Sequence, residues 1–321
     1  MAVRTESYAA AAEGVEELLG IELKPTTLWR VVQKRGEALR ERQHAEGQQA
    51  WGMPQRGGIV KGEERRNQKM GIALDGVYVN IRDEGWKEVK VGAVFEITPL
   101  TRHEKVRRLK RQGQSVKAED EIRDMVKAEA ISYCALLGSV EDFEPLQWVE
   151  ALRRQLPSCW ESVVIGDAAD WIDRIYAKCY YDSERIIDWY HACEHLGGLA
   201  RQAFGEGSDQ GPKWLEKRKD ALWQGQVHEV VNAIRALSID RADREREANY
   251  FHKHRRGMNY LEFCERDLPV GSGVVEGGGC KGVIEGRLKR VGMRWSREGA
   301  QNMIALRCQY YGDHWKHLWA I

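Results

Sequence analysis

The sequence predicts an α/β protein, and three observations carry that prediction. Residues 71–81 and 86–97 are apolar runs, and the second alternates apolar and polar side chains with the period of a strand. The short apolar run 163–167 ends in an acid and is followed by a helical pattern from Trp171, as in a strand–helix unit. Residues 197–263 contain no strand pattern and predict helices only.

The composition is that of a globular protein. The chain has 321 residues, 42% of them hydrophobic and 31% charged, which is enough for a full core and not typical of disorder. The net charge of +1 gives no overall signal for nucleic acid, so such a signal has to come from local clusters. Seven cysteines without a C-x-x-C pair argue against a disulfide framework or zinc ribbon and favour a reducing, cytoplasmic setting. Residues 1–20 lack the pattern of a signal peptide, and no apolar run has the length of a membrane span.

Residues 1–67 are expected to form an N-terminal helical segment and a linker. Residues 8–43 predict two short helices around a break at Gly20, a pattern that resembles a helix-turn-helix but is shared by any small helical hairpin. The stretch 41–67 is polar and rich in glutamine and arginine, and this predicts a linker.

The remaining elements follow from periodicity. In chain order we expect strands 71–81 and 86–97, a charged helix 117–128, strand 131–137, helix 146–156, strand 163–167, a helix from 171, a short strand from 184 running into a helix, and helices 213–223, 227–237, 242–264 and 299–311. The stretch 197–264 is therefore expected to be a helical insertion, which divides the α/β part into residues 68–196 and 265–321.

Three acids lie at positions that suggest a specific role for a carboxylate. Asp75 lies within an apolar strand, where an unpaired acid is unfavourable, although an Asp-Gly hairpin turn at this point is an equal alternative. Asp167 ends a strand at the edge where α/β sheets place their chemistry, and helix capping is its alternative. Glu276 falls in the first turn of a helix for which Ser272 is the expected cap, and glycines on both sides permit a close approach. A simple helix-dipole role is the alternative for Glu276.

A basic segment bearing a tryptophan follows Glu276 and is opposed only by Glu285. Such a segment suits a phosphate backbone, and a solvated basic face is the alternative. Trp295 is able to stack on an unpaired base, although packing in the core is the more common role of a tryptophan. The residues expected to contact DNA are Lys281, Arg287, Lys289, Arg290, Arg294 and Trp295.

Histidines gather near residue 190. His191 and His195 lie one helical turn apart with Cys193 between them, which admits a zinc site. No second ligand pair follows at the usual spacing, so a structural role is favoured.

The order of the three acids resembles that of the DDE transposases. The segment Ile187-Asp-Trp-Tyr-His191 resembles the Asp/Cys-x-x-His motif of the Mutator-like and related bacterial transposases. The stretches Gly271-Ser-Gly-Val-Val-Glu276 and Arg287-Leu-Lys-Arg-Val-Gly-Met-Arg-Trp295 are similar to the insertion-sequence transposases of the ISKra-four type. The resemblance spans residues 70–320.

This resemblance implies an RNase H-like mixed sheet with flanking helices, interrupted by an all-helical insertion and preceded by the N-terminal helical segment. It implies a DNA transposase that cleaves and transfers strands with two Mg²⁺ or Mn²⁺ ions held by Asp75, Asp167 and Glu276, with Asp188 and His191 in support. The implied partners are double-stranded DNA, both transposon ends and target, and further copies of the chain. The implied location is the cytoplasm, in association with the nucleoid.

Two features depart from the family's pattern. Ala168 follows the second acid where the family usually has glycine, and family members are commonly longer at the N-terminus. The sequence therefore also admits a truncated DNA-binding remnant without catalysis. An RNase H-like nuclease that cuts without rejoining is a further alternative, because the same metal site serves both reactions.

Overall fold

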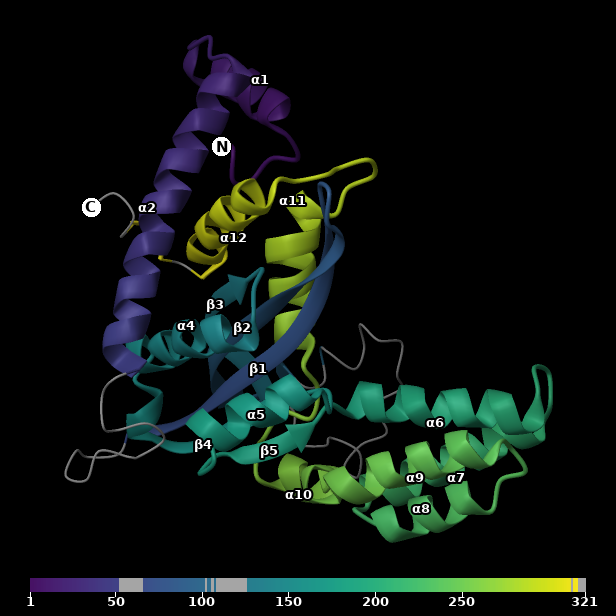
Figure 1. Cartoon of the computed structure of the whole chain (residues 1–321). Coiled ribbons are helices and arrows are strands. Elements are labelled where there is room, and N and C mark those ends of the chain that lie inside the picture. Colours follow the sequence, from purple (N-terminus) through teal and green to yellow (C-terminus); the bar gives the residue numbers. More distant parts are fainter. Residues whose placement is uncertain (52–65, 102, 105–106, 108–125, 313, 317–321) are drawn as a thin grey trace.

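The structure, a computed structural model, describes the chain except for residues 52–65, 102, 105–106, 108–125, 313 and 317–321 (Figure 1). A five-stranded mixed sheet of order β3-β2-β1-β4-β5 lies at its centre. The strands are β1 (Arg66–Ile81), β2 (Gly85–Pro99), β3 (Val126–Leu136), β4 (Cys159–Gly166) and β5 (Glu184–Ile187). β2 is antiparallel to both of its neighbours, whereas β4 is parallel to β1 and to β5. The mixed α/β class expected from the sequence is confirmed.

Helices cover both faces of this sheet. On one face α4 (Val140–Arg153) and α5 (Asp170–Cys179) pack on a core that includes Ile72 and Leu74 of β1. On the other face the π-helical η3 (Val274–Glu285), α11 (Gly286–Leu288) and α12 (Arg297–Tyr311) share a second core with Ala73 and Val77. Successive side chains of β1 point into alternate cores, so residues two apart in β1 face the same set of helices.

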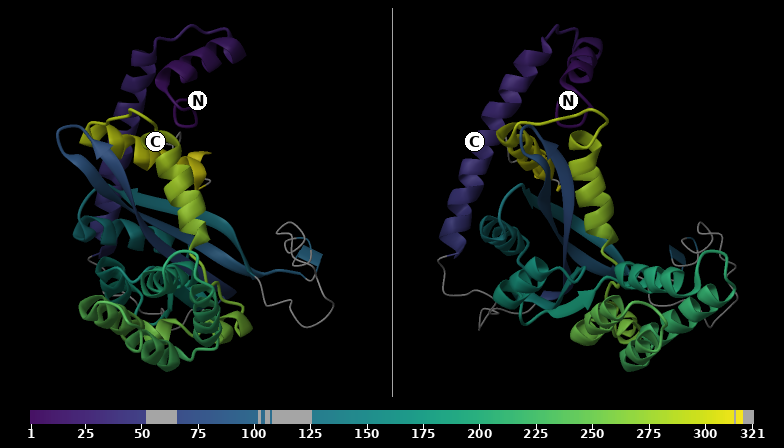
Figure 2. Two further views of the ribbon diagram at one scale, coloured as in Figure 1. Left: turned by 90° about the vertical axis from the view of Figure 1, so that its right-hand side faces the viewer. Right: turned by 45° about the vertical axis from the view of Figure 1, so that its right-hand side comes forward.

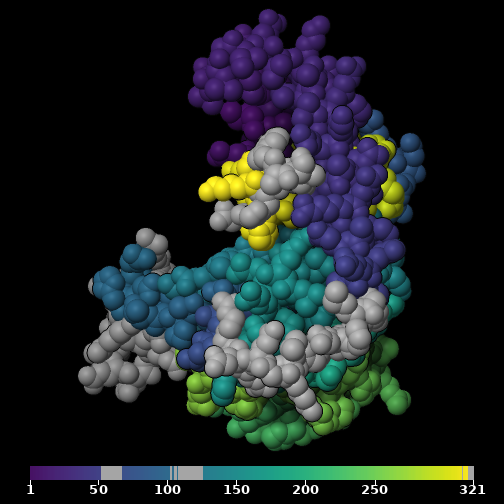
Figure 3. All heavy atoms as spheres, turned by 90° about the vertical axis from the view of Figure 1, so that its left-hand side faces the viewer, coloured from purple at the N-terminus to yellow at the C-terminus, as the bar shows by residue number. Residues whose placement is uncertain are grey.

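The N-terminal segment differs from the two short helices and linker that the sequence predicts. α1 (Tyr8–Leu19) ends at Gly20 as expected, but α2 runs unbroken from Pro25 to Trp51 and so includes the first part of the predicted linker. Figure 3 shows α2 extending along one face of the molecule. Gly36 lies against Asn302 of α12, and Gly47 lies against Pro145 of α4. α2 is therefore a covering helix of the α/β core, and its narrow buried stripe explains why its sequence looks like a polar linker.

A run of helices lies to one side of the sheet, between β5 and η3 (Figures 1 and 2). It comprises α6 (Trp189–Phe204), α7 (Gln210–Trp223), α8 (Val227–Arg235), α9 (Arg241–His254), the 3₁₀ turn η2 (Arg255–Gly257) and α10 (Tyr260–Glu265). The ring of Trp189 packs on Trp223 and Tyr260, with centroids 5.1 and 4.8 Å away. The run begins at Trp189 rather than at the expected residue 197. The single helix expected over 242–264 is broken at Gly257, where a Cβ would lie 2.8 Å from the carbonyl oxygen of Arg185 on β5.

Two further expectations need correction. β1 passes straight through Asp75 and Gly76 in continuous register with β2, so no hairpin turn is present there. Residues 126–128, expected at the end of a charged helix, belong to β3, and residues 117–125 lie outside the described residues. Within the described parts of the chain, no helix combines the length and apolarity needed to cross a bilayer.

Candidate active site

Strand register brings two of the three predicted acids to one place. β1 and β4 run parallel with Ala73 opposite Ile165, and both side chains belong to the core under η3. Asp75 and Asp167 each follow two residues later, so they share that face and lie at equivalent positions on adjacent strands. Gly166 permits this approach, because a Cβ there would lie 2.6 Å from the carbonyl oxygen of Leu74.

Asp75 is a partly buried carboxylate without a cationic partner of its own. Its Oδ1 accepts a hydrogen bond from the backbone of Gly76 at 2.7 Å, and its Oδ2 accepts one from Cys280 Sγ at 3.3 Å. Burial raises the pKa of Asp75, the negative charge of Asp167 raises it further, and His191 lowers it. Among the described residues, neither Asp75 nor Asp167 forms an ion pair with a lysine or arginine. Arg185 interacts electrostatically with Asp167, but no cation in the described part of the chain contacts either carboxylate directly, and such carboxylates fit a divalent cation.

Asp167 lies just past the end of β4 and makes one local bond. Its Oδ1 accepts from the backbone of Ala169 at 3.0 Å, and its own carbonyl oxygen accepts from the guanidinium of Arg185 at 2.5 Å. Asp167 does not cap α5, because the residue at the cap position is Ala169 and no side chain caps the first turn of this helix. Arg185, whose side chain is 11% exposed, also pairs with Asp173 at 3.1 Å. Nothing in the sequence around β5 pointed to Arg185 as a residue that fixes the second acid.

Glu276 enters from η3, which covers the face that carries the other two acids. Ser272 does not cap this helix as expected, since its hydroxyl donates instead to Glu276 Oε1 at 2.6 Å. A Cβ on Gly278 would collide with the Tyr133 hydroxyl, and one on Gly279 would lie 2.7 Å from Val91. Gly277 faces open space. Most of the glycine run therefore serves close packing of η3 on β2 and β3, and only Gly277 leaves room beside the carboxylate.

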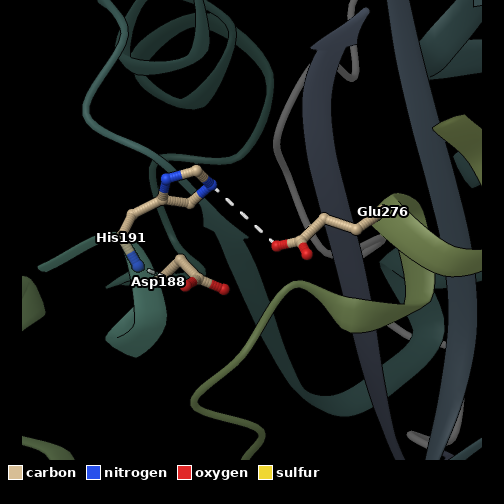
Figure 4. A group of neighbouring side chains, drawn as sticks. All are labelled: Asp188, His191 and Glu276. Carbon is tan, nitrogen blue, oxygen red and sulfur yellow. Dashed lines mark hydrogen bonds and ion pairs between the residues drawn. The ribbon is translucent and has the colours of Figure 1, made fainter. Parts of the chain in front are cut away.

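Asp188 and His191 lie at the start of α6, and their side chains point toward Glu276 of η3 (Figure 4). Asp188 is fully buried, its Oδ1 accepts from the backbone of His191 at 2.9 Å, and its Oδ2 accepts from the backbone of Ser272. His191 Nε2 lies 3.9 Å from Glu276 Oε1. Ligand atoms of Asp188, His191 and Glu276 all lie within 4.8 Å of one another, which makes them a group able to hold a metal ion.

The predicted trio of acids does not form such a compact group by itself. Among the described residues, the cluster within 4.8 Å contains Glu276 but neither Asp75 nor Asp167. Two residues link the two parts: His191 acts electrostatically on Asp75 and approaches Glu276, and Cys280 of η3 hydrogen-bonds to Asp75. Cys280 was missed by sequence reasoning, although its position one helical turn after Glu276 was a usable signal.

The geometry does not bring His191 and His195 together in one zinc site. His195 Nδ1 lies 2.7 Å from Glu247 Oε2, and its ring stacks on Tyr250 with centroids 4.1 Å apart. His195 thus holds α6 against α9, while His191 faces Glu276. Both contacts of His195 are therefore with the neighbouring helix, away from the edge of the sheet.

The residues expected to contact DNA differ in their exposure to solvent. Lys281, Lys289, Arg290 and Arg294 are exposed, with Lys289 paired to Glu285 at 2.8 Å and Arg290 to Glu6 at 2.6 Å. Arg287 is only 2% exposed, so it does not lie on the exposed basic surface that the other four residues share. Trp295 is partly buried, and its backbone extends the sheet by bonding to Asn80 and Arg82 at 3.2 and 2.8 Å. Core packing is therefore the observed role of Trp295.

Comparison of the chain with protein-family models, and separately with curated proteins, gave no match.

Proposed function

We propose that this chain is a metal-dependent polynucleotidyl transferase of the DDE type, acting as a DNA transposase. The observation that carries the proposal is that Asp75 within β1 and Asp167 just past the end of the adjacent parallel strand β4 follow on the same face of the sheet, with Glu276 on the helix over that face. Two acids on neighbouring strands facing one helix-borne acid form a suitable cradle for cations at a phosphodiester.

The strand topology supports an RNase H-like fold for the proposed catalytic domain. The resemblance to DDE transposases implies a mixed sheet with flanking helices, and the sheet of order β3-β2-β1-β4-β5, in which β2 alone runs against the others, is mixed in this sense. The helices α6–α10 lie between β5 and η3, where a helical insertion between the second acid and the glutamate belongs.

The chemistry of the donor set fits hard cations. Asp75, Asp167 and Glu276 offer carboxylate oxygens, which Mg²⁺ and Mn²⁺ prefer. Burial is the main cause of the raised pKa of Asp75, and the negative charge of Asp167 adds to it, so a bound cation would relieve both effects. When bound, two such ions activate a water or 3′-hydroxyl and stabilise the leaving oxygen of a phosphoryl displacement. The chain itself holds the three carboxylates on strands and a helix. Ser272 orients Glu276 through a hydrogen bond, and Cys280 orients Asp75 in the same way.

In this proposal Asp188 and His191 are positioning residues. Asp188 joins the start of α6 to the backbone before η3, and His191 faces both Glu276 and Asp75. The exposed Lys281, Lys289, Arg290 and Arg294 follow Glu276 in the chain and would contact the phosphates of double-stranded DNA. As transposases join paired ends, the active species would contain more than one copy of the chain.

Nicking of a supercoiled plasmid that carries the genomic DNA flanking the coding sequence tests the proposal. Wild type is compared in Mn²⁺, Mg²⁺ and EDTA with Asp75→Asn, Asp167→Asn and Glu276→Gln. Asp209→Asn is the matched control, because Asp209 is exposed and makes no capping bond. We expect metal-dependent nicks that vanish in the three site variants and persist in the control; equal nicking by all variants would remove these acids from the site.

The same assay separates the alternatives. Joined DNA products alongside the nicks identify a transposase, whereas nicks without joining identify a nuclease that uses the same metal site. DNA binding without nicks in any metal would identify a non-catalytic remnant.

A further inference from the structure

A cavity of about 430 Å³ lies between the N-terminal helices and the segment that follows η3. Its walls include Tyr8, Trp29, Arg82, Arg287, Arg294 and Trp295. The views in Figure 2 place α1 and the chain start beside this end of η3, whereas Glu276 lies in the first turn at the other end. The cavity is thus separate from the acids of the proposed active site.

The floor of the cavity holds a buried positive charge. Arg287 is 2% exposed, and its guanidinium lies 4.9 Å from the ring centroids of both Tyr8 and Trp295. Its one recorded hydrogen bond is a weak contact from Nη1 to Met293 Sδ at 3.7 Å, and its buried Nε has no partner among the described residues. Burial lowers the pKa of Arg287, and the nearby Arg307 and Arg290 lower it further.

No acid compensates this charge in the described part of the chain. The walls of the cavity contain no aspartate or glutamate, and Arg287 forms no ion pair there. A buried guanidinium without a counter-ion is strongly unfavourable, whereas an anion bound beside it would supply the missing partner. The similarly buried Arg307 differs, because it donates to the carbonyl oxygens of Val283, Val3 and Gly282.

The rim of the cavity adds two more cations and an aromatic surface. Arg82 and Arg294 are exposed, and neither makes an ion pair among the described residues. Trp29 is 47% exposed, and the buried Nε1 of Trp295 has no hydrogen-bond partner in the described structure. Arginines recognise phosphate, and exposed indole rings stack on nucleobases. A second cavity, of about 440 Å³, contrasts with this one, because its arginine, Arg266, is already paired with Glu161 and Glu184.

We propose that this cavity binds one nucleotide, with its phosphate between Arg82 and Arg294 above Arg287 and its base against the indole of Trp29. A volume of about 430 Å³ lies within the range of small-molecule sites and accommodates a nucleotide. The occupant is either a free nucleotide or the end of a DNA strand, and both present the same phosphate and base. The proposal is independent of the metal chemistry assigned to Asp75, Asp167 and Glu276.

Binding is measured in EDTA, so that the acids and their metals do not contribute. The probes are AMP, followed by the rise in thermal midpoint, and a fluorescein-labelled single-stranded oligonucleotide with a 5′-phosphate, followed by fluorescence anisotropy. The site variants are Arg294→Ala and Trp29→Ala. The matched controls are Arg241→Ala and Trp160→Ala, which remove an exposed arginine and an exposed tryptophan elsewhere.

We expect each site variant to weaken binding of at least one probe roughly tenfold, the loss of one charge-assisted or stacking contact, while the controls bind as wild type does. Binding of AMP identifies a free nucleotide as the occupant, and binding of the oligonucleotide alone identifies a strand end. Affinities for both probes that are the same in site variants and controls, or no binding of either probe to wild type, would overturn the proposal.

Arg287→Met provides a second measurement, made on the residue at the floor of the cavity. Because it removes an uncompensated buried charge, we expect the variant to fold with a thermal midpoint at or above that of wild type and to lose the ligand-induced rise. A variant that keeps the full rise would contradict a role for Arg287, and a variant that fails to fold leaves the decision to Arg294→Ala and Trp29→Ala.

Discussion

The buried carboxylate of Asp188 accepts a hydrogen bond from the backbone of Ser272, a residue 84 positions later in the chain. The same carboxylate caps α6 through the backbone of His191. One side chain therefore fixes both the start of the long helical run and the loop that leads into η3. Ser272 in turn donates to Glu276, so Asp188 acts on the position of Glu276 through one intermediate residue.

Replacement of Asp188 by alanine should destabilise the fold strongly. It leaves two backbone N–H groups without their acceptor at a fully buried site, and we expect a loss of about 2–4 kcal/mol in the free energy of unfolding. Urea denaturation followed by circular dichroism measures the loss. Asp240→Ala is the matched control, because Asp240 caps α9 at an exposed site through local bonds only, and we expect about 1 kcal/mol there. Equal losses in the two variants would show that the bond to Ser272 contributes nothing beyond capping.

Asp75→Asn should stabilise the protein in a pH-dependent way. Burial raises the pKa of Asp75 above its ordinary value of 3.8, so the folded state binds its proton more tightly than the unfolded state does. The wild type therefore loses stability as the pH rises from 3.8 through the raised folded-state pKa, and the neutral amide is spared this loss. Thermal midpoints across the acid range should show a gain for the variant at neutral pH that disappears below pH 3.8. A difference between the two proteins that stays constant with pH would contradict the assignment.

Divalent cations should stabilise the wild type by binding to Asp75 and Asp167. At a Mn²⁺ concentration about 100 times the dissociation constant, binding adds about 2.7 kcal/mol to the free energy of unfolding. We expect this gain to be lost in Asp75→Asn and Asp167→Asn and kept in Asp209→Asn, with calorimetry as the measurement. This readout is independent of DNA cleavage. Full retention of the gain in both site variants would place the cation elsewhere.

The glycine run of η3 offers an internal comparison. Gly279→Ala forces a Cβ to within 2.7 Å of Val91 and should destabilise the protein by about 1–3 kcal/mol. Gly277→Ala meets no atom within 4 Å and should be neutral or stabilising by about 0.4–1 kcal/mol, because alanine restricts the unfolded chain. Chemical denaturation of both variants checks this. If Gly277→Ala were the more harmful of the two, the packing of η3 on β2 would not be the reason for the glycines.

Local patterns were sufficient for the sheet and for most helices. Period-two alternation predicted β2, and the short apolar run before Asp167 predicted β4 followed by α5. The same reasoning failed for α2, whose buried stripe of Val32, Gly36 and Leu39 is too narrow to stand out in a polar sequence. It also failed for Arg287, because a basic run gives no sign of which member is enclosed by Tyr8 and Trp295.

The sequence by itself determined that strands alternate with helices, that Asp167 lies at the end of a strand, and that a strandless helical stretch separates Asp167 from Glu276. These features depend on side-chain periodicity along short segments, which is a local property. Only the tertiary structure decided that Asp75 lies within a continuous strand, which strand β1 pairs with in parallel, that the backbone of Ser272 donates to Asp188, and that Arg287 is buried. Each of these joins residues far apart in the chain, and such pairings depend on how whole elements pack, which no local pattern encodes.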